Sequence, residues 1–411
     1  MTYRSLYFNL KKIDIETGRS VHIPGTGIEI FKFAFRSKSW AWLPGAGEYT
    51  CEEHRMSFHE RAADLSRSDF IEYPAGIKHH DIDIIENRDF DITVFKKMVP
   101  KKSGRILFLF HGLNEKQWDK YLPWAEKLVE FTGSTVVLFP IAFHMNRVPP
   151  EWADIRLMNR VSAARRQHSP SILNSTFANA AISARLQLIP QRFFWSGLQT
   201  FYDVVQFIDE VRAGTHQFAD PQAGFDFFTF SIGSFLGEIL IMSNPKDYFH
   251  DSMFFIFCGG PTLDRMSPNS KFILDSDAAI AIYSFYMERL ENELRLDKRM
   301  AHYFDGGHIA GRYFKSMLSY QKEKEFREKR FQELHSRIFA LALGKDRVIP
   351  PNEVLNTLQG DFREIPVHVA INDFPYPYQH INPFPIDREF DDIVDREFNK
   401  VFETAAQFLR Q

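Results

Sequence analysis

The feature that most constrains the fold is a series of short, almost continuously apolar segments separated by stretches with helical spacing. Residues 106–110 read ILFLF, residues 252–257 read SMFFIF and residues 338–343 read IFALAL. Runs of this length without polar alternation are typical of strands that are covered on both faces. Because stretches long enough for helices lie between them, the pattern predicts an α/β fold with a doubly wound, mostly parallel sheet.

The remaining expected elements follow from apolar alternation in strands and from the helical period. Further strands are expected at residues 28–35, 90–95, 135–139, 225–230 and 365–371. Helices are expected at residues 52–65, 118–131, 198–211, 234–242 and 390–409, the last of them amphipathic.

Three regions fall outside this strand–helix rhythm. Residues 1–89 are mixed in character, and we expect an N-terminal extension there, beside a main domain at residues 90–411. Residues 142–197 and 261–337 are too long to be simple connections, and both have helical patterns. We expect these two regions to be lid insertions that pack over one end of the sheet.

Composition excludes several classes of function. The 411 residues are 44% hydrophobic and 25% charged, which suits a large folded core. The formal net charge of −3 argues against a general electrostatic attraction to nucleic acid or to an anionic membrane. The 42 phenylalanines predict a strongly aromatic core, and they favour an aromatic pocket.

Cysteine content and hydropathy indicate the compartment. Cys51 and Cys258 are too few for a disulfide framework or a four-thiolate zinc site. No apolar run is long enough for a membrane span, and the first residues contain no stretch typical of a signal peptide. We expect a cytoplasmic protein without membrane insertion.

The segment most informative about chemistry is residues 225–237, FDFFTFSIGSFLG. An expected strand ends at Ser231 and an apolar helix follows at once. A sharp strand-to-helix turn of this kind exposes a serine Oγ at the carboxyl edge of a sheet, and it needs small neighbours. Gly233 is small, whereas Thr229 occupies the position where glycine is most usual. The alternative nucleophile, Ser234, is flanked by Ile232 and Leu236, whose side chains would crowd the turn.

From about residue 90 to its C-terminus, the chain resembles the α/β-hydrolase superfamily, within a poorly characterised, bacterial-type subgroup. Some lipases of the superfamily carry threonine at the position of Thr229. The resemblance implies a serine hydrolase with Ser231 as its nucleophile. It supplies no substrate.

A second matching motif is His111-Gly112, directly after the expected strand at residues 106–110. In this superfamily, a His-Gly pair after the third strand shapes the loop that stabilises the oxyanion. The resemblance therefore implies that the backbone N–H groups of Leu113 and Ile232 are the two donors.

A third match is Gly-x-Asp after the expected strand at residues 338–343. It resembles the acid segment of the superfamily, and it implies that Asp346 orients the catalytic histidine. Asp264 is the alternative acid, because some lipases carry the acid after an earlier strand.

The histidine base should follow the acid in chain order. Only His368 and His380 do so, and His368 lies within an expected strand. His380 lies in a loop that is stiffened by several prolines, so we expect it to be the base. His308, in the sequence Asp-Gly-Gly-His, ranks below it because it precedes Asp346.

No metal or cofactor site is expected. His79 and His80 are adjacent and would point apart on a strand. His54 and His59 are five residues apart, which misses the four-residue spacing of helical metal ligands. The sequence contains no phosphate-binding glycine loop and no dinucleotide fingerprint.

These observations predict a serine hydrolase that cleaves an ester-like bond through Ser231, His380 and Asp346. The apolar residues 278–287 and the aromatic residues 193–195 favour a covered pocket for a small or medium acyl substrate. The alternative is a catalytically silent binding or scaffold protein with the same fold, because a fold does not imply activity.

Overall fold

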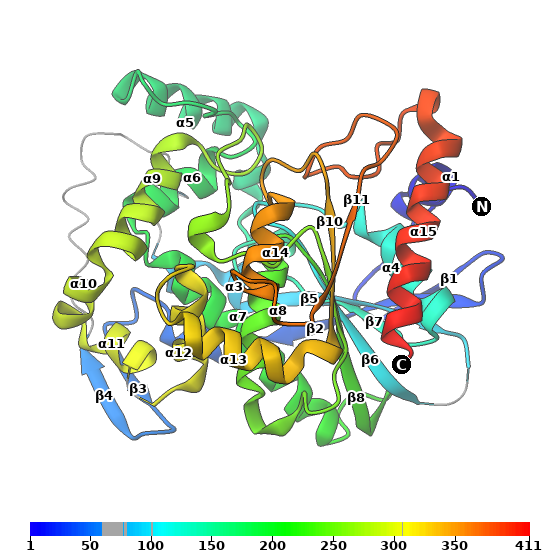
Figure 1. The fold of residues 1–411 in the computed structure, drawn as a ribbon, viewed down its shortest axis with the longest axis horizontal. Helices are drawn as coiled ribbons and strands as arrows, with labels where there is room; N and C mark the ends of the chain where they lie inside the picture. Colours follow the sequence, from blue (N-terminus) through cyan, green and yellow to red (C-terminus); the bar gives the residue numbers. More distant parts are fainter. Residues whose placement is uncertain (60–76, 78–79, 100–101, 306) are drawn as a thin grey trace.

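A nine-stranded sheet runs through the middle of the molecule, with helices on both of its faces (Figure 1). The structure is a computed structural model that describes residues 1–59, 77, 80–99, 102–305 and 307–411. The strands are β1 (Ser20–Ile23), β2 (Ile28–Arg36), β3 (Glu48–Cys51), β4 (Met56–His59), β5 (Asp89–Lys97), β6 (Ser103–Phe110), β7 (Thr135–Leu138), β8 (Ala219–Phe230), β9 (Phe254–Phe257), β10 (Ile338–Leu343) and β11 (His368–Asn372).

The helices are α1 (Tyr3–Lys11), α3 (Ile85–Arg88), α4 (Tyr121–Thr132), α5 (Ile155–His168), α6 (Ala180–Leu188), α7 (Arg192–Arg212), α8 (Ile232–Ser243), α9 (Ser276–Tyr283), α10 (Leu290–Leu296), α11 (Lys298–Asp305), α12 (Ile309–Leu318), α13 (Lys324–Leu334), α14 (Pro351–Gln359) and α15 (Asp391–Leu409). In Figure 1, α1, α4 and α15 cover one face of the sheet, and α7, α8 and α14 cover the other.

The strand order of the main sheet is β1-β2-β5-β7-β6-β8-β9-β10-β11. All neighbours from β7 to β11 are parallel, whereas β5 is antiparallel to both β2 and β7. The chain moves outward from β6 to β7 and then crosses back to β8 on the other side of β6. Ligands of open α/β sheets bind beyond the carboxyl ends of the strands at such a switch point. This topology confirms the expected α/β-hydrolase fold with its doubly wound, mostly parallel sheet.

The phenylalanines fill both faces of the sheet, because alternate residues of a strand point to opposite sides. On one face, the Phe108 ring stacks on the rings of Phe110 and Phe227, with centroids 5.9 and 5.7 Å apart. On the other face, Phe228 stacks on Phe255 and on Phe402 of α15, each at 5.3 Å. The expected aromatic core is therefore present in two layers.

The N-terminal region contributes strands to the main sheet, because β1 and β2 belong to it and β2 pairs with β5 over nine residues. One expectation about this region is wrong. In the described first part of the helix expected at residues 52–65, β3 and β4 instead form a separate two-stranded sheet. The part of that expected helix from residue 60 onward lies outside the described residues.

The two insertions are joined to each other by a buried ion pair. The Arg165 guanidinium on α5 donates to both carboxylate oxygens of Asp275, over 2.8 and 2.7 Å. Asp275 also caps α9 by accepting a hydrogen bond from the Ala278 N–H at 3.0 Å. A bidentate pair with little exposure fixes orientation as well as distance, so α5 and α9 are held in one arrangement. The first insertion is shorter than expected, because α7 already begins at Arg192.

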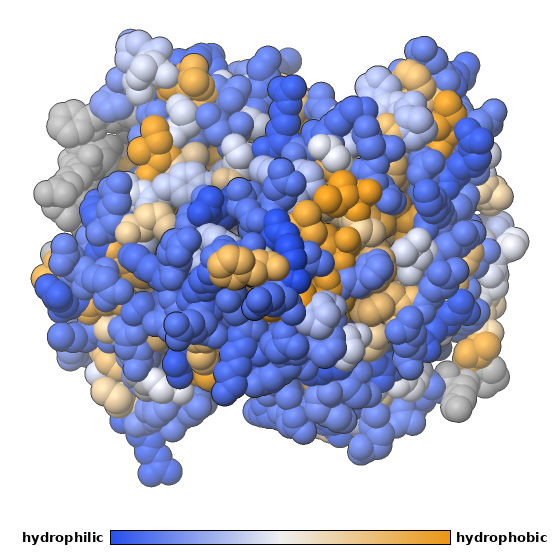
Figure 2. Space-filling view, viewed as in Figure 1, coloured by the Kyte–Doolittle hydropathy of each residue, from blue (hydrophilic) through white to orange (hydrophobic). Residues whose placement is uncertain are grey.

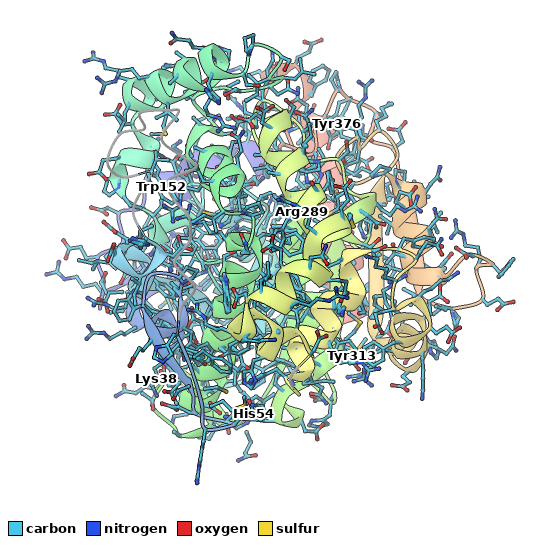
Figure 3. All side chains as sticks on the ribbon, turned by 90° about the vertical axis from the view of Figure 1, so that its left-hand side faces the viewer. Lys38, His54, Trp152, Arg289, Tyr313 and Tyr376 are labelled. Atoms are coloured by element: carbon cyan, nitrogen blue, oxygen red, sulfur yellow. The ribbon has the colours of Figure 1, made fainter. Side chains whose placement is uncertain are left out.

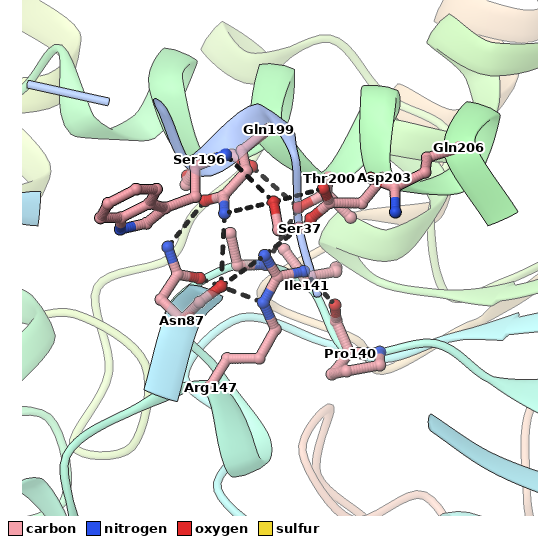
Figure 4. Close-up of polar contacts among 12 residues, drawn as sticks. Ser37, Asn87, Pro140, Ile141, Arg147, Ser196, Gln199, Thr200, Asp203 and Gln206 are labelled. Carbon is pink, nitrogen blue, oxygen red and sulfur yellow. Dashed lines mark hydrogen bonds and ion pairs between the residues drawn. The ribbon is translucent and has the colours of Figure 1, made fainter. Parts of the chain in front are cut away.

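A buried polar network holds the loop after β7 against α7 (Figure 4). The Arg147 guanidinium donates to the Asp203 carboxylate at 2.7 Å, and both side chains are fully buried. Asp203 also accepts a hydrogen bond from Ser37 at 2.5 Å, and Arg147 donates to the side chain of Asn87 at 3.0 Å. Segments from the N-terminal region, the β7 loop and α7 therefore meet at one charged pair.

This pair makes a strong prediction about stability. We expect Asp203→Asn to lower the free energy of unfolding by about 3–5 kcal/mol, because the Arg147 guanidinium would stay buried without its counter-charge. Urea denaturation followed by tryptophan fluorescence measures the loss. The matched control is Asp209→Asn on the same helix, whose partner Lys246 is exposed; its cost should stay below about 1 kcal/mol. Equal losses in the two variants would contradict the prediction.

The main sheet ends in an open edge on the side of β11. β11 is the last strand, and Ile371 on it is 46% exposed. Figure 2 shows hydrophobic residues gathered on the surface over β10 and β11.

None of the helices in the described part of the chain combines the length and the hydropathy that a membrane crossing requires.

Candidate active site

Ser231 lies at the turn between β8 and α8, in a backbone conformation that side chains rarely adopt. Its φ is 58° and its ψ is −125°, and such strain persists only where the surroundings enforce it. Gly233 explains how the turn is built: a Cβ there would lie 2.7 Å from the His111 carbonyl oxygen and 2.7 Å from the Phe110 Cβ. The end of β6 therefore packs directly against the turn, and only glycine fits.

Ser231 is hydrogen bonded to His380, which in turn is hydrogen bonded to Asp346. The Ser231 Oγ lies 2.7 Å from His380 Nε2, and His380 Nδ1 lies 2.6 Å from Asp346 Oδ2. A carboxylate only accepts, so His380 donates through Nδ1–H and its Nε2 is free to accept the serine proton. The structure thus brings together the three residues that were expected to form the catalytic group.

The loops around His380 and Asp346 hold both side chains in place. The His380 ring stacks on Phe230, the last residue of β8, with centroids 5.1 Å apart. Asp346 Oδ1 accepts hydrogen bonds from the backbone N–H groups of Val348 and Ile349 at 2.9 and 3.0 Å. Only the other oxygen of Asp346 is left for the imidazole, which fixes the tautomer of His380.

The alternative candidates from the sequence are engaged elsewhere. Ser234 is fully buried and accepts a hydrogen bond from Thr229 Oγ1 at 2.9 Å. Asp264 accepts hydrogen bonds from Thr262 at 2.7 Å and from the Tyr320 N–H at 3.0 Å. His368 stacks on Phe339 at the sheet edge, with ring centroids 4.4 Å apart. Each of these side chains therefore has a structural contact of its own.

The hydrogen bond between Thr229 and Ser234 accounts for the presence of threonine where glycine is usual. The threonine that replaces the usual glycine holds the first turn of α8 through this hydrogen bond. Across the turn, a Cβ on Gly259 would lie 2.4 Å from the Ser234 Cβ. The space behind the turn is therefore filled by a hydroxyl pair, and the small residue needed there is Gly259, which follows β9.

The residues expected to form the oxyanion site lie in the same pocket as Ser231. Leu113 and Ile232 both line this pocket. His111 fixes the loop after β6 through two hydrogen bonds. Its Nδ1–H donates to the Gly112 carbonyl at 2.8 Å, and its Nε2 accepts from the Ile141 N–H at 2.9 Å. Burial and the neighbouring His144 hold the pKa of His111 well below its usual range, so the ring is neutral.

Asn114 is a positioning residue that sequence reasoning missed. It follows Leu113 with a φ of 62°, a conformation that asparagine tolerates better than most residues. Its side-chain amide donates to the carbonyl oxygens of Ala178 and Phe272, at 2.9 and 2.6 Å. Those carbonyls belong to the first and the second insertion, so Asn114 ties the loop after β6 to both. An Asn after a His-Gly-x turn was the available signal.

Two apolar pockets meet beside Ser231. One contains Ser231 itself and is lined mainly by the second insertion, with Leu263, Met266 and Ile282. The other extends under α7 and α12, where its walls include Phe194, Phe235 and Phe314. Leu113, Phe193 and Ile232 line both pockets.

Cys258 lies near this site but is not suited to nucleophilic attack. Burial and the Asp346 carboxylate raise the pKa of its thiol well above the usual value. The thiol is therefore neutral at physiological pH, and only a thiolate is a strong nucleophile.

His308 lies in a separate cluster of histidines. It contacts Cys51 and His302, and burial together with His302 and His54 lowers the pKa of His308 to about 4. Among the described residues, Cys51, His54, His302 and His308 form a group whose side chains could hold a metal ion. The spacing of His54 and His59 does not reveal this group, because His59 is exposed on β4 and is not part of it. His79 lies outside the described residues.

A family model described as a family of unknown function (DUF6051) matches residues 1–410. No curated protein matches the sequence. Similar solved structures include carboxyl esterase 2 from the mycorrhizal fungus Tuber melanosporum, with 10% identity, 97% of this chain and 92% of that chain covered, and a TM-score of 0.44. A thermostable esterase from Pseudomonas putida ECU1011 has 8% identity, coverage of 99% and 88%, and a TM-score of 0.43. At such low identity, the chemistry has to be judged from the site itself.

Proposed function

This chain belongs to the family of unknown function DUF6051, and we propose that it is a serine hydrolase that cleaves small or medium ester-like substrates. One observation carries the proposal: a continuous hydrogen-bond chain from Ser231 through His380 to Asp346, at a strained strand-to-helix turn. A serine, a base and an acid in this relation are the recurring apparatus of acyl transfer.

In the first half-reaction, the Ser231 Oγ attacks the substrate carbonyl while His380 Nε2 takes the hydroxyl proton. The Asp346 carboxylate stabilises the imidazolium that forms. The N–H groups of Leu113 and Ile232 donate to the developing oxyanion, and each such donor is worth about 3 kcal/mol in the transition state. His380 then returns the proton to the leaving alcohol, and the acyl group remains on Ser231.

In the second half-reaction, water attacks the acyl-enzyme and His380 accepts its proton. The tetrahedral intermediate collapses with release of the carboxylic acid, and His380 returns the proton to the Ser231 Oγ. Each proton that His380 takes is thus given back within the cycle, and the proposed cycle requires no cofactor.

The pockets support a short acyl group. They leave about 60 Å³ and about 30 Å³ that the centre of a water molecule can reach. One water-sized group needs roughly 10–15 Å³ by this measure, so a chain of only a few carbons fits without rearrangement. The walls are aliphatic and aromatic, which favours an apolar acyl chain. Residues of both insertions contribute to these walls, and we propose that the insertions act as the lid of the site.

A fluorophosphonate probe tests the class of enzyme, because it labels only an activated serine. We expect the purified chain to be labelled at Ser231, with a competing short-chain ester slowing the reaction. The probe's adduct is located by peptide mass spectrometry. An unlabelled but folded protein would instead support the catalytically silent alternative.

A series of p-nitrophenyl esters tests the substrate class. We expect kcat/KM to be highest for acetate or butyrate, and at least about tenfold lower for octanoate and palmitate, because one or two methylenes that find no room already cost 1–3 kcal/mol. At a fixed enzyme concentration and at substrate concentrations well below KM, the ratio of initial rates equals the ratio of kcat/KM values. Efficient cleavage of palmitate or of a polymeric ester would contradict the covered short pocket.

A further inference from the structure

Away from Ser231, four potential metal ligands converge from two regions that are distant in sequence. Cys51 ends β3, and His54 lies in the tight loop between β3 and β4. His302 lies on α11, and His308 directly precedes α12. Figure 3 labels His54 on this side of the molecule, below the helices of the second insertion drawn in yellow. Their candidate ligand atoms all lie within 4.8 Å of one another.

The spacing of these atoms fits a tetrahedral zinc ion. With zinc–nitrogen bonds of about 2.05 Å and a zinc–sulfur bond of about 2.3 Å, a tetrahedron separates two nitrogens by about 3.3 Å and nitrogen from sulfur by about 3.6 Å. Cys51 Sγ lies 3.6 Å from His54 Nδ1 and 3.4 Å from His308 Nε2. His308 Nε2 lies 3.0 Å from His302 Nε2. These three separations are close to the edges of a tetrahedral zinc site, and the remaining ligand atoms lie within 4.8 Å of one another, so small side-chain adjustments would close the site.

The surroundings of His308 also match those of a metal ligand. Its Nε2 faces the cluster, while its Nδ1 lies 3.1 Å from the Tyr202 hydroxyl and 3.3 Å from a carboxylate oxygen of Glu53. Metal-bound histidines usually donate their second N–H to a carboxylate or another oxygen, which fixes the tautomer. The Tyr303 ring stacks on His308 with centroids 4.6 Å apart, and the Phe58 ring packs at a tilt against His302 with centroids 4.9 Å apart.

We propose that Cys51, His54, His302 and His308 bind one zinc ion. The Cys51 thiol loses its proton on binding, so the thiolate and the nearby Glu53 carboxylate together balance the two positive charges. One sulfur and three nitrogens suit zinc, whereas oxygen ligands would be expected for magnesium or calcium. Four protein ligands close the coordination sphere, and closed sites are structural, not catalytic.

The ion's role is to fasten the β3–β4 hairpin to the second insertion. The chain connects these ligands to the substrate side of the molecule, because α12 begins directly after His308 and its residues Ala310 and Phe314 line the larger apolar pocket. Zinc therefore stabilises one wall of that pocket without touching the reacting atoms. This inference does not depend on the proposed hydrolase activity.

Metal analysis of the full chain, produced with zinc in the medium and with any affinity tag removed, tests the ligand set. We expect about one zinc per chain in the wild type and well under half of that in Cys51→Ser and His308→Ala. The matched control is His59→Ala, which removes an exposed histidine of the same hairpin and should retain the full amount. Zinc retained in full by both ligand variants would overturn the proposal.

Two further measurements use only the wild-type chain, so they do not depend on whether a ligand variant folds. After chelation and addition of Co²⁺, a thiolate-to-cobalt charge-transfer band should appear in the near ultraviolet, together with the visible bands of tetrahedral cobalt. Chelation should also lower the melting temperature by several degrees, and added zinc should restore it. Wild-type protein with neither zinc, nor a cobalt–thiolate band, nor a shift in melting temperature would show that the cluster is only a set of hydrogen-bonded neutral histidines.

Discussion

Replacing Ser231 by alanine is expected to reduce kcat by at least about 10⁴-fold, and to abolish labelling by a fluorophosphonate probe. The reason is that the substitution removes the only hydroxyl that is hydrogen bonded to His380 Nε2 among the described residues. The fold should survive, because a methyl group fits where the hydroxymethyl group lay. Ester turnover and probe labelling on the same preparation measure both effects, and circular dichroism checks the fold.

Ser234→Ala is the matched control for this prediction. Ser234 lies three residues further along, in the first turn of α8, but its hydroxyl is buried and hydrogen bonded to Thr229 instead of His380. Losing that hydrogen bond should cost about 1 kcal/mol of stability and little activity. If Ser234→Ala were inactive and Ser231→Ala active, the assignment of the nucleophile would be wrong.

Replacing His380 by alanine should be about as severe as replacing Ser231, because the members of a catalytic triad act as a unit. Without the imidazole, Ser231 Oγ loses the base to which it is hydrogen bonded among the described residues. Asp346→Asn should cost somewhat less, yet still several orders of magnitude, since an amide favours the wrong tautomer of His380. Steady-state kinetics with a short p-nitrophenyl ester measures all three variants.

His368→Ala provides the control for the histidine substitution. His368 is also C-terminal to Asp346, but it is exposed on the edge strand β11 and contacts Phe339 instead of Ser231. We expect its activity to stay within about twofold of the wild type, as for surface substitutions remote from a site. Undiminished turnover in His380→Ala would rule out the proposed base.

Two of the three residues proposed for catalysis could be predicted from the sequence because each closely follows a recognisable buried strand. Ser231 follows the apolar residues of β8, and Asp346 follows those of β10. His380 was reached by chain order and by the stiffness of its loop. These are local signals, since a strand end and the turn after it are encoded in neighbouring residues.

The supporting contacts could not be predicted, because they join segments far apart in the chain. Thr229 departs from the usual motif. Its role depends on a hydrogen bond to Ser234 and on the close approach of Gly259, and neither can be read from the sequence. The position of Asn114 after His-Gly-x marks a turn, but the two carbonyls that it bridges lie 64 and 158 residues away and cannot be read from that position. The charged pair of Arg147 and Asp203 likewise joins a loop to a helix 56 residues away.

By itself, the sequence determined the class of fold and the three residues proposed for catalysis, since strand–helix alternation and strand-end motifs are periodic and local. Only the tertiary structure decided that the N-terminal strands β1 and β2 belong to the main sheet, because pairing with β5 depends on which edge is free. It also decided that Cys51 and His54 face His302 and His308. Ligands separated by some 250 residues have no spacing signal, so their convergence emerges only when the chain is folded.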